Sequence, residues 1–128
     1  MVLLLAMLGP LVTSCGDKLN HAQYRITPAV TSDRARVSRV LDSVANKAEL
    51  SAQQPPPFAG GSFVYYDNVV VHGPTVDLFA RADQHGILID LEGGTGPKPS
   101  RFAESERLLD QRLPAVFGAR CLKNTRLE

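Results

Sequence analysis

The chain has 128 residues, of which 44% are hydrophobic and 21% are charged, as is ordinary for a globular protein that folds around one core. Fourteen basic residues against thirteen acidic residues give a net charge of +1. This balance excludes the strongly basic surface that nucleic-acid binding requires, so we expect no nucleic-acid partner.

An uncharged apolar run occupies residues 2–12 at the start of the chain. A membrane-spanning helix needs about twenty apolar residues, and this run has only about eleven. Its length therefore indicates the hydrophobic region of an export signal. The run leads into the sequence LVTSC at residues 11–15, which resembles the lipobox of bacterial lipoprotein precursors.

The resemblance implies a signal peptide over residues 1–14, cleavage between Ser14 and Cys15, and a diacylglycerol (palmitate-type chains) on the Cys15 sulfur. A further acyl chain on the new amino terminus is usual in that family. Each buried methylene contributes about 0.8 kcal/mol, so two or more chains hold a protein on a membrane. The resemblance thus implies anchorage in the bacterial cell envelope, facing the periplasm or the cell surface. It does not distinguish the inner membrane from the outer membrane.

Two alternatives concern the same segment. Such precursors carry Lys or Arg before the apolar run, and this chain carries none there, which leaves open a start further upstream. Alternatively, residues 1–11 form a buried core helix and Cys15 is an ordinary thiol. If Cys15 is lipidated, Cys121 has no partner for a disulfide, and we expect it to be a small buried hydrophobic residue rather than a reactive thiol. The competing interpretation is a Cys15–Cys121 disulfide in a secreted protein without lipid.

Residues 15–30 are polar and mixed, and we expect them to form the lipidated cysteine and a tether, ending in a short strand at residues 24–27. Residues 31–50 have the pattern of an amphipathic helix that Thr31 or Ser32 caps, with Asp33 in the first turn. Its apolar stripe consists of Val37, Val40, Leu41, Val44, Ala45 and Ala48.

Three strand-like runs follow a proline-rich connector at residues 53–61; they are residues 62–72, 76–82 and 87–92. Short, turn-rich links between them predict an antiparallel meander with one face in water. A tight turn at residues 67–68 that splits the first run into a hairpin is an alternative.

After a glycine-rich loop at residues 93–99, Ser100 is expected to cap a second helix. Pro114 should kink or end this helix, and Gly118 is a suitable stop. A short edge strand at residues 121–122 and a polar tail at residues 123–128 complete the chain. The predicted fold is an α+β two-layer sandwich over residues 31–122, in the order helix, three-stranded antiparallel meander, helix, with both helices on one sheet face.

Candidate chemistry is sparse. His72 and His85 lie at predicted strand ends and could join Asp90 in a metal site, although no histidine pair has zinc-site spacing and we favour exposed turn histidines. Asp90 and Glu92 alternate onto one strand face, where paired carboxylates could do acid–base chemistry or hold a cation. We favour simple solvation of that face.

These patterns favour a membrane-anchored cell-envelope lipoprotein with a small binding or assembly domain, a protein partner in the envelope and no cofactor. One alternative is a small envelope enzyme or metal-binding protein that uses His72, His85 and Asp90. Another is an immunity-like inhibitor of a toxin, which is consistent with the size and the predicted cell-envelope location of the protein but is supported by no particular residue. Of these, we favour a binding role over an enzyme.

Overall fold

The computed structural model describes residues 19–68 and 74–124 of the chain. The predicted signal segment, with Ser14 and Cys15, lies outside the described residues. Within them the chain forms two α-helices, six strands and two 3-10 turns. In chain order these are β1 (Leu19–Ile26), α1 (Asp33–Ala48), β2 (Ser51–Ala52), η2 (Pro57–Ala59), β3 (Val64–Asp67), β4 (Val76–Asp83), β5 (Gly86–Thr95), α2 (Ser100–Phe117), η3 (Gly118–Arg120) and β6 (Cys121–Asn124).

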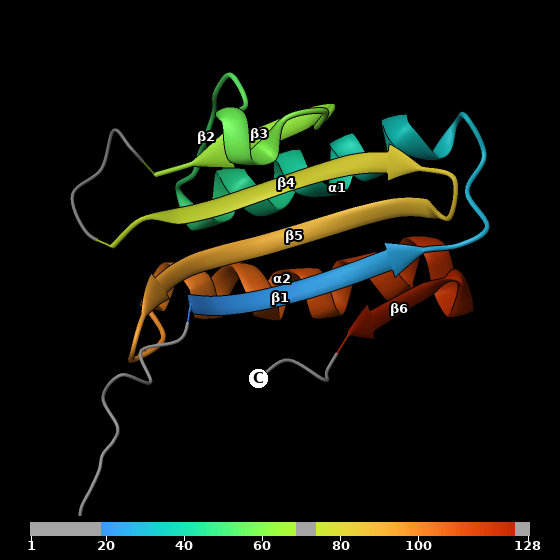
Figure 1. Cartoon of the computed structure of the whole chain (residues 1–128). Coiled ribbons are helices and arrows are strands. Elements are labelled where there is room, and N and C mark those ends of the chain that lie inside the picture. The colour runs from blue at the N-terminus through green and yellow to red at the C-terminus, as the bar shows by residue number, and fades with distance from the viewer. Residues whose placement is uncertain (1–18, 69–73, 125–128) are drawn as a thin grey trace, which may run out of the picture.

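The six strands form one antiparallel sheet in the order β2-β3-β4-β5-β1-β6. Figure 1 shows α1 and α2 side by side behind this sheet, both on the same face. The short η2 turn lies on the opposite side, in front of β3. We call the sheet face opposite the helices the open face. Both edge strands are short, which limits the unpaired backbone that the sheet edges present.

The predicted α+β class and the shared helix face agree with the structure, but the predicted three-stranded meander is wrong, because the sheet has six strands. The largest error concerns β1, for which only a short strand at residues 24–27 was predicted, at the end of a tether. The strand instead begins at Leu19 and lies inside the sheet between β5 and β6. Ala22, Tyr24 and Ile26 are buried in the core, whereas His21 and Gln23 alternate onto the open face. That alternation is a strand pattern, which the polar residues obscured.

The middle of the chain follows the prediction more closely. The runs at 76–82 and 87–92 form β4 and β5, joined by a tight connection in which Asp83 pairs with Gly86. Gly86 has a φ of 130°, and an added Cβ would lie 2.1 Å from the carbonyl oxygen of Ile26. Only glycine fits this position, because the turn packs directly against the end of β1. Among residues 62–68 of the first run, only β3 is strand; residues 69–73, including His72, lie outside the described residues.

Both helices use their apolar stripes to cover the sheet. The buried positions of α1 are the predicted ones together with Asp33. The helix α2 does not end at Pro114, as one prediction allowed, but continues to Phe117, and Gly118 with a φ of 58° follows it. Leu113 and Phe117 are both buried, so packing of the last turn offsets the hydrogen bond that proline removes.

Candidate functional site

The sheet register brings four polar residues into one row across the open face. Asp67 on β3 is the Cα partner of Asp77 on β4, Asp77 is the partner of Glu92 on β5, and Glu92 is the partner of His21 on β1. Side chains of directly paired residues lie on the same face about 5 Å apart. Three carboxyl groups and an imidazole therefore lie side by side across four neighbouring strands.

Asp90 lies on the same face, two residues before Glu92, and its side chain is only 4% exposed. Its Oδ1 atom lies 2.8 Å from His21 Nε2 and accepts a hydrogen bond of 2.9 Å from the Gln23 amide. Its Oδ2 atom has no hydrogen-bond partner among the described residues, and the Arg81 guanidinium lies 3.9 Å away. A buried carboxylate is thus held through one oxygen while the other is left without a donor.

Glu92 completes a compact group, because its Oε2 atom lies 3.9 Å from His21 Nε2. We call His21, Asp90 and Glu92 the carboxylate–histidine cluster. Burial raises the pKa of the Glu92 carboxyl group, and the nearby Asp90 and Asp77 raise it further, against the opposing effect of His21. These effects favour the protonated form of the Glu92 carboxyl group as long as no further positive charge lies beside it.

The next carboxyl group in the row has a similar environment. Burial raises the pKa of Asp77, and Asp67 acts in the same direction, while a hydrogen bond from the Tyr65 hydroxyl opposes the shift. Tyr65 is itself buried, as is its neighbour Phe79, and Phe58 of η2 packs edge-on against both rings. This aromatic corner covers the β3–β4 side of the open face, so the accessible part lies over β5 and β1.

The structure separates the histidine and carboxylate that sequence analysis grouped. His85 is exposed in the β4–β5 connection, where its backbone N–H donates to Asp83 Oδ1 at 2.7 Å. Asp90 lies five residues further along an extended strand, roughly 16 Å away. His72 lies outside the described residues. The histidine next to Asp90 is His21, which sequence analysis placed in the tether. The alternation along β1 could have identified the strand, but not its pairing with β5.

Cys121 begins β6 and is half-buried, with its side chain packed against the main core. Burial raises the pKa of its thiol, and the nearby Asp110 carboxylate adds to the effect. Both favour the protonated thiol, which is a weak nucleophile.

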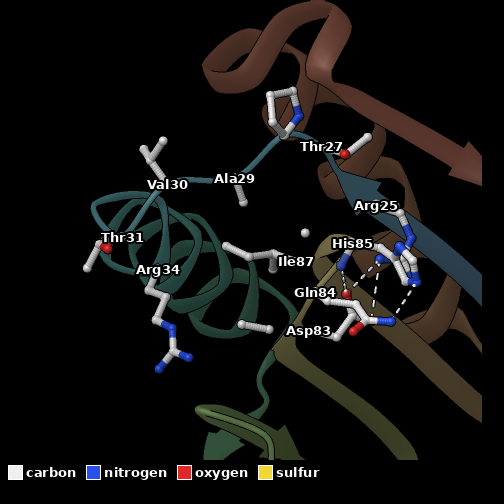
Figure 2. Close-up of a pocket in the computed structure, with 13 residues that line it drawn as sticks. Arg25, Thr27, Ala29, Val30, Thr31, Arg34, Asp83, Gln84, His85 and Ile87 are labelled. Atoms are coloured by element: carbon white, nitrogen blue, oxygen red, sulfur yellow. Dashed lines mark hydrogen bonds and ion pairs between the residues drawn. The ribbon is translucent and has the colours of Figure 1, made fainter.

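A cavity of about 770 Å³ lies at the far end of the sheet, between the β1–α1 connection and the β4–β5 turn. Figure 2 shows Arg25, Asp83 and His85 gathered on one side and Arg34 on the other. Arg25 Nη1 lies 3.1 Å from Asp83 Oδ1, so this pair neutralises much of its own charge. The Arg34 guanidinium lies 5.3 Å from the centre of the Phe63 ring, so Arg34 also has an interaction partner within the protein, in a cation–π contact.

A second hollow of about 550 Å³ lies on the outer surface of the helix layer. Arg36 and Arg39 of α1 and Arg112 of α2 line it, together with Val116, which is 44% exposed. Arg112 Nη1 donates to the Ser43 hydroxyl at 2.6 Å, which bridges the two helices. This arginine-lined hollow is basic, whereas the open face of the sheet carries the carboxylate row.

No protein-family model matches the chain, and no curated protein or solved structure shows a significant similarity to it. Within residues 19–68 and 74–124, neither helix combines the length and the apolar character that crossing a membrane requires. Any functional assignment therefore depends on the chain's own residues and their arrangement.

Proposed function

We propose that the chain is the precursor of a lipid-anchored cell-envelope protein, whose folded domain is a binding or assembly module rather than an enzyme. The observation that carries the proposal is the sequence LVTSC at residues 11–15 after an uncharged apolar run too short to span a bilayer. Acyl chains on Cys15 would supply the membrane attachment.

The position of Cys15 would also orient the domain. Leu19, the first residue of β1, is four positions after Cys15, and an extended chain spans at most about 14 Å over four positions. Anchorage would therefore hold the start of β1 and its partner Thr95 close to the lipid surface. The opposite end of β1 is seven residue positions and about 23 Å away, so it would point away from the membrane, and so would the 770 Å³ cavity beside it.

The open face of the sheet is the surface we assign to the partner. The helices cover the other face, and the aromatic corner closes only the β3–β4 side. On the accessible side, Leu88 of β5 and Leu122 of β6 flank Arg25 of β1, and Leu122 is 61% exposed. An apolar pair beside charged groups is a common composition for a protein-binding surface.

Metabolic labelling with an alkyne fatty acid tests the anchor. We expect the label on the wild-type chain and on Cys121→Ser, and none on Cys15→Ser, which should also leave the membrane fraction. Equal labelling of wild type and Cys15→Ser would contradict the proposed anchor, because the remaining label could not be on the Cys15 sulfur.

Site-specific photocrosslinking in cells tests the assigned surface. A crosslinker at Leu88 or Leu122, on the open face, should trap one partner of constant mass, whereas the same group at Ala103, exposed on α2, should not. Trapping of that partner from Ala103 alone would show that the helix layer is the binding surface.

A further inference from the structure

We propose that His21, Asp90 and Glu92 form a binding site for a divalent first-row transition-metal ion, of which Zn²⁺ is the representative case. The site lies on the open face of the sheet. It does not depend on lipid attachment or on the partner, so it can be tested separately from the function proposed above.

The geometry of the three side chains suits such an ion. One ligand atom from each residue, an imidazole nitrogen and two carboxylate oxygens, lies within 4.8 Å of the others. Zinc binds nitrogen and oxygen ligands at about 2.0–2.2 Å, which places tetrahedral ligand atoms about 3.3 Å apart. The distances from His21 Nε2 are 2.8 Å to Asp90 Oδ1 and 3.9 Å to Glu92 Oε2, on either side of that value. Small side-chain rotations would therefore complete the arrangement.

The backbone positions of the ligands are fixed by the sheet. His21 and Glu92 are direct Cα partners on β1 and β5, and Asp90 lies on the same face two residues before Glu92. The neighbouring Gln23 amide donates to Asp90 Oδ1 and orients this carboxylate from outside the ligand set. Hydrogen bonds of this kind commonly hold metal-ligating carboxylates in place.

The second Asp90 oxygen is an independent sign of a missing partner. The side chain is 4% exposed, yet Oδ2 has no hydrogen-bond donor among residues 19–68 and 74–124. A buried carboxylate oxygen normally has such a donor or a metal ion. Arg81, at 3.9 Å, partly balances the charge, but its side chain is 39% exposed and can turn toward water. The carboxylates of Asp90 and Glu92 together match the charge of a divalent ion.

The chemistry of the ligand set narrows the class of ion. An imidazole with two carboxylates suits Zn²⁺ or a similar first-row ion better than Ca²⁺, which prefers six or more oxygen ligands. Three protein ligands leave one tetrahedral position free, and His21 and Glu92 are 26% and 24% exposed, so water or a donor from another molecule could reach it.

The three histidines of the chain allow a matched test. The full-length protein, purified without an affinity tag and stripped with a chelator, is titrated with Zn²⁺ by isothermal calorimetry. We expect one ion per chain for wild type, for His72→Asn and for His85→Asn. Binding should weaken about tenfold or more in His21→Asn, because even the loss of a residue that only orients a metal ligand costs at least about tenfold.

Glu92→Gln is the second variant, because it keeps the size of the side chain and removes the ligand charge. It should weaken Zn²⁺ binding in the same way, while Glu104→Gln, at an exposed position of α2, should not. Thermal unfolding without metal serves as the check that each variant is folded. Failure of wild type to bind Zn²⁺, or binding that His85→Asn reduces as much as His21→Asn does, would overturn the proposal.

Discussion

The carboxylate of Asp33, which is fully buried at the start of α1, is paired with the guanidinium of Arg120 immediately before β6. Arg120 Nη1 lies 2.9 Å from Asp33 Oδ2, and Nη2 lies 3.3 Å from Oδ1. Arg120 also donates to the carbonyl of Pro28, and its own carbonyl accepts from Thr27 N–H. These bonds join the C-terminal segment to the β1–α1 connection, across 87 positions of sequence.

Removal of Arg120 should therefore destabilise the protein more than removal of an arginine from a surface pair. In Arg120→Gln the buried Asp33 carboxylate loses the two hydrogen bonds from the guanidinium and keeps only the more distant Arg36, whose Nη1 lies 3.7 Å from Asp33 Oδ1. Removing the close partner of a buried charge is costly. Arg107→Gln breaks only the exposed pair with Glu104 and should change stability little. Urea unfolding should show a clearly lower midpoint for Arg120→Gln alone; equal midpoints for both variants would contradict this role of the pair.

The same pair predicts how stability depends on pH. The hydrogen bond from Arg120 and the one from the Val30 backbone N–H lower the pKa of Asp33 below its ordinary value of 3.8. The unfolded chain therefore binds the proton more readily, so the stabilisation is complete above pH 3.8 and is lost as the pH falls toward the lowered folded-state pKa. Unfolding free energies measured from about pH 6 to about pH 2 should fall more steeply in wild type than in Arg120→Gln.

The aromatic corner should contribute to stability through Phe79. Its ring is 2% exposed and packs between Tyr65 and Phe58, with ring centroids 5.8 Å and 5.9 Å away. Phe79→Ala should lower the free energy of unfolding by about 3 kcal/mol, the usual loss for a buried phenylalanine. Phe58→Ala, at a ring that is 56% exposed, should cost about 1 kcal/mol or less. A larger loss for Phe58→Ala in chemical denaturation would mean that η2 is the more important partner.

Gly86 should be far less tolerant of substitution than Gly96. Both have a positive φ, which strains alanine: Gly96, at 77°, lies near the left-handed region, where the cost is roughly 1–2 kcal/mol, whereas Gly86, at 130°, lies outside it. At Gly86 the new Cβ would also lie 2.1 Å from the Ile26 carbonyl oxygen, whereas at Gly96 no atom lies within 4 Å. Thermal melting should show a much larger drop for Gly86→Ala, because the end of β1 must move away from the turn. Similar melting temperatures for Gly86→Ala and Gly96→Ala would refute the claim that Gly86 is the less tolerant position.

The parts of the fold that depend on local pattern could be predicted from the sequence. The stripe of α1 and the β4–β5 hairpin follow from residue spacing and short turns. The position of β1 in the sheet could not be predicted in this way, because β1 pairs with β5, and this pairing joins Leu19 to Thr95 across most of the chain. The stretch that contains Thr95 was itself predicted to be a loop, since its glycines obscured the continuation of β5.

The same distinction applies to the carboxylate–histidine cluster. Asp90 and Glu92 are two residues apart, so their shared face follows from strand geometry alone. His21 joins them only through the register between β1 and β5, which no local pattern in the sequence specifies. Sequence analysis grouped His85 with Asp90, which is close to it in sequence, but His85 lies in the turn before β5 and is therefore far from Asp90 in space.

The most direct test of the proposed lipid anchor is the mass of the N-terminal peptide of the mature protein, purified from the envelope of its native host. We predict a peptide that begins at Cys15 and carries a diacylglycerol on its sulfur, with Ser14 removed. A peptide that runs through Ser14 into Cys15, with no added hydrocarbon mass, would contradict the proposed anchor and the orientation derived from it.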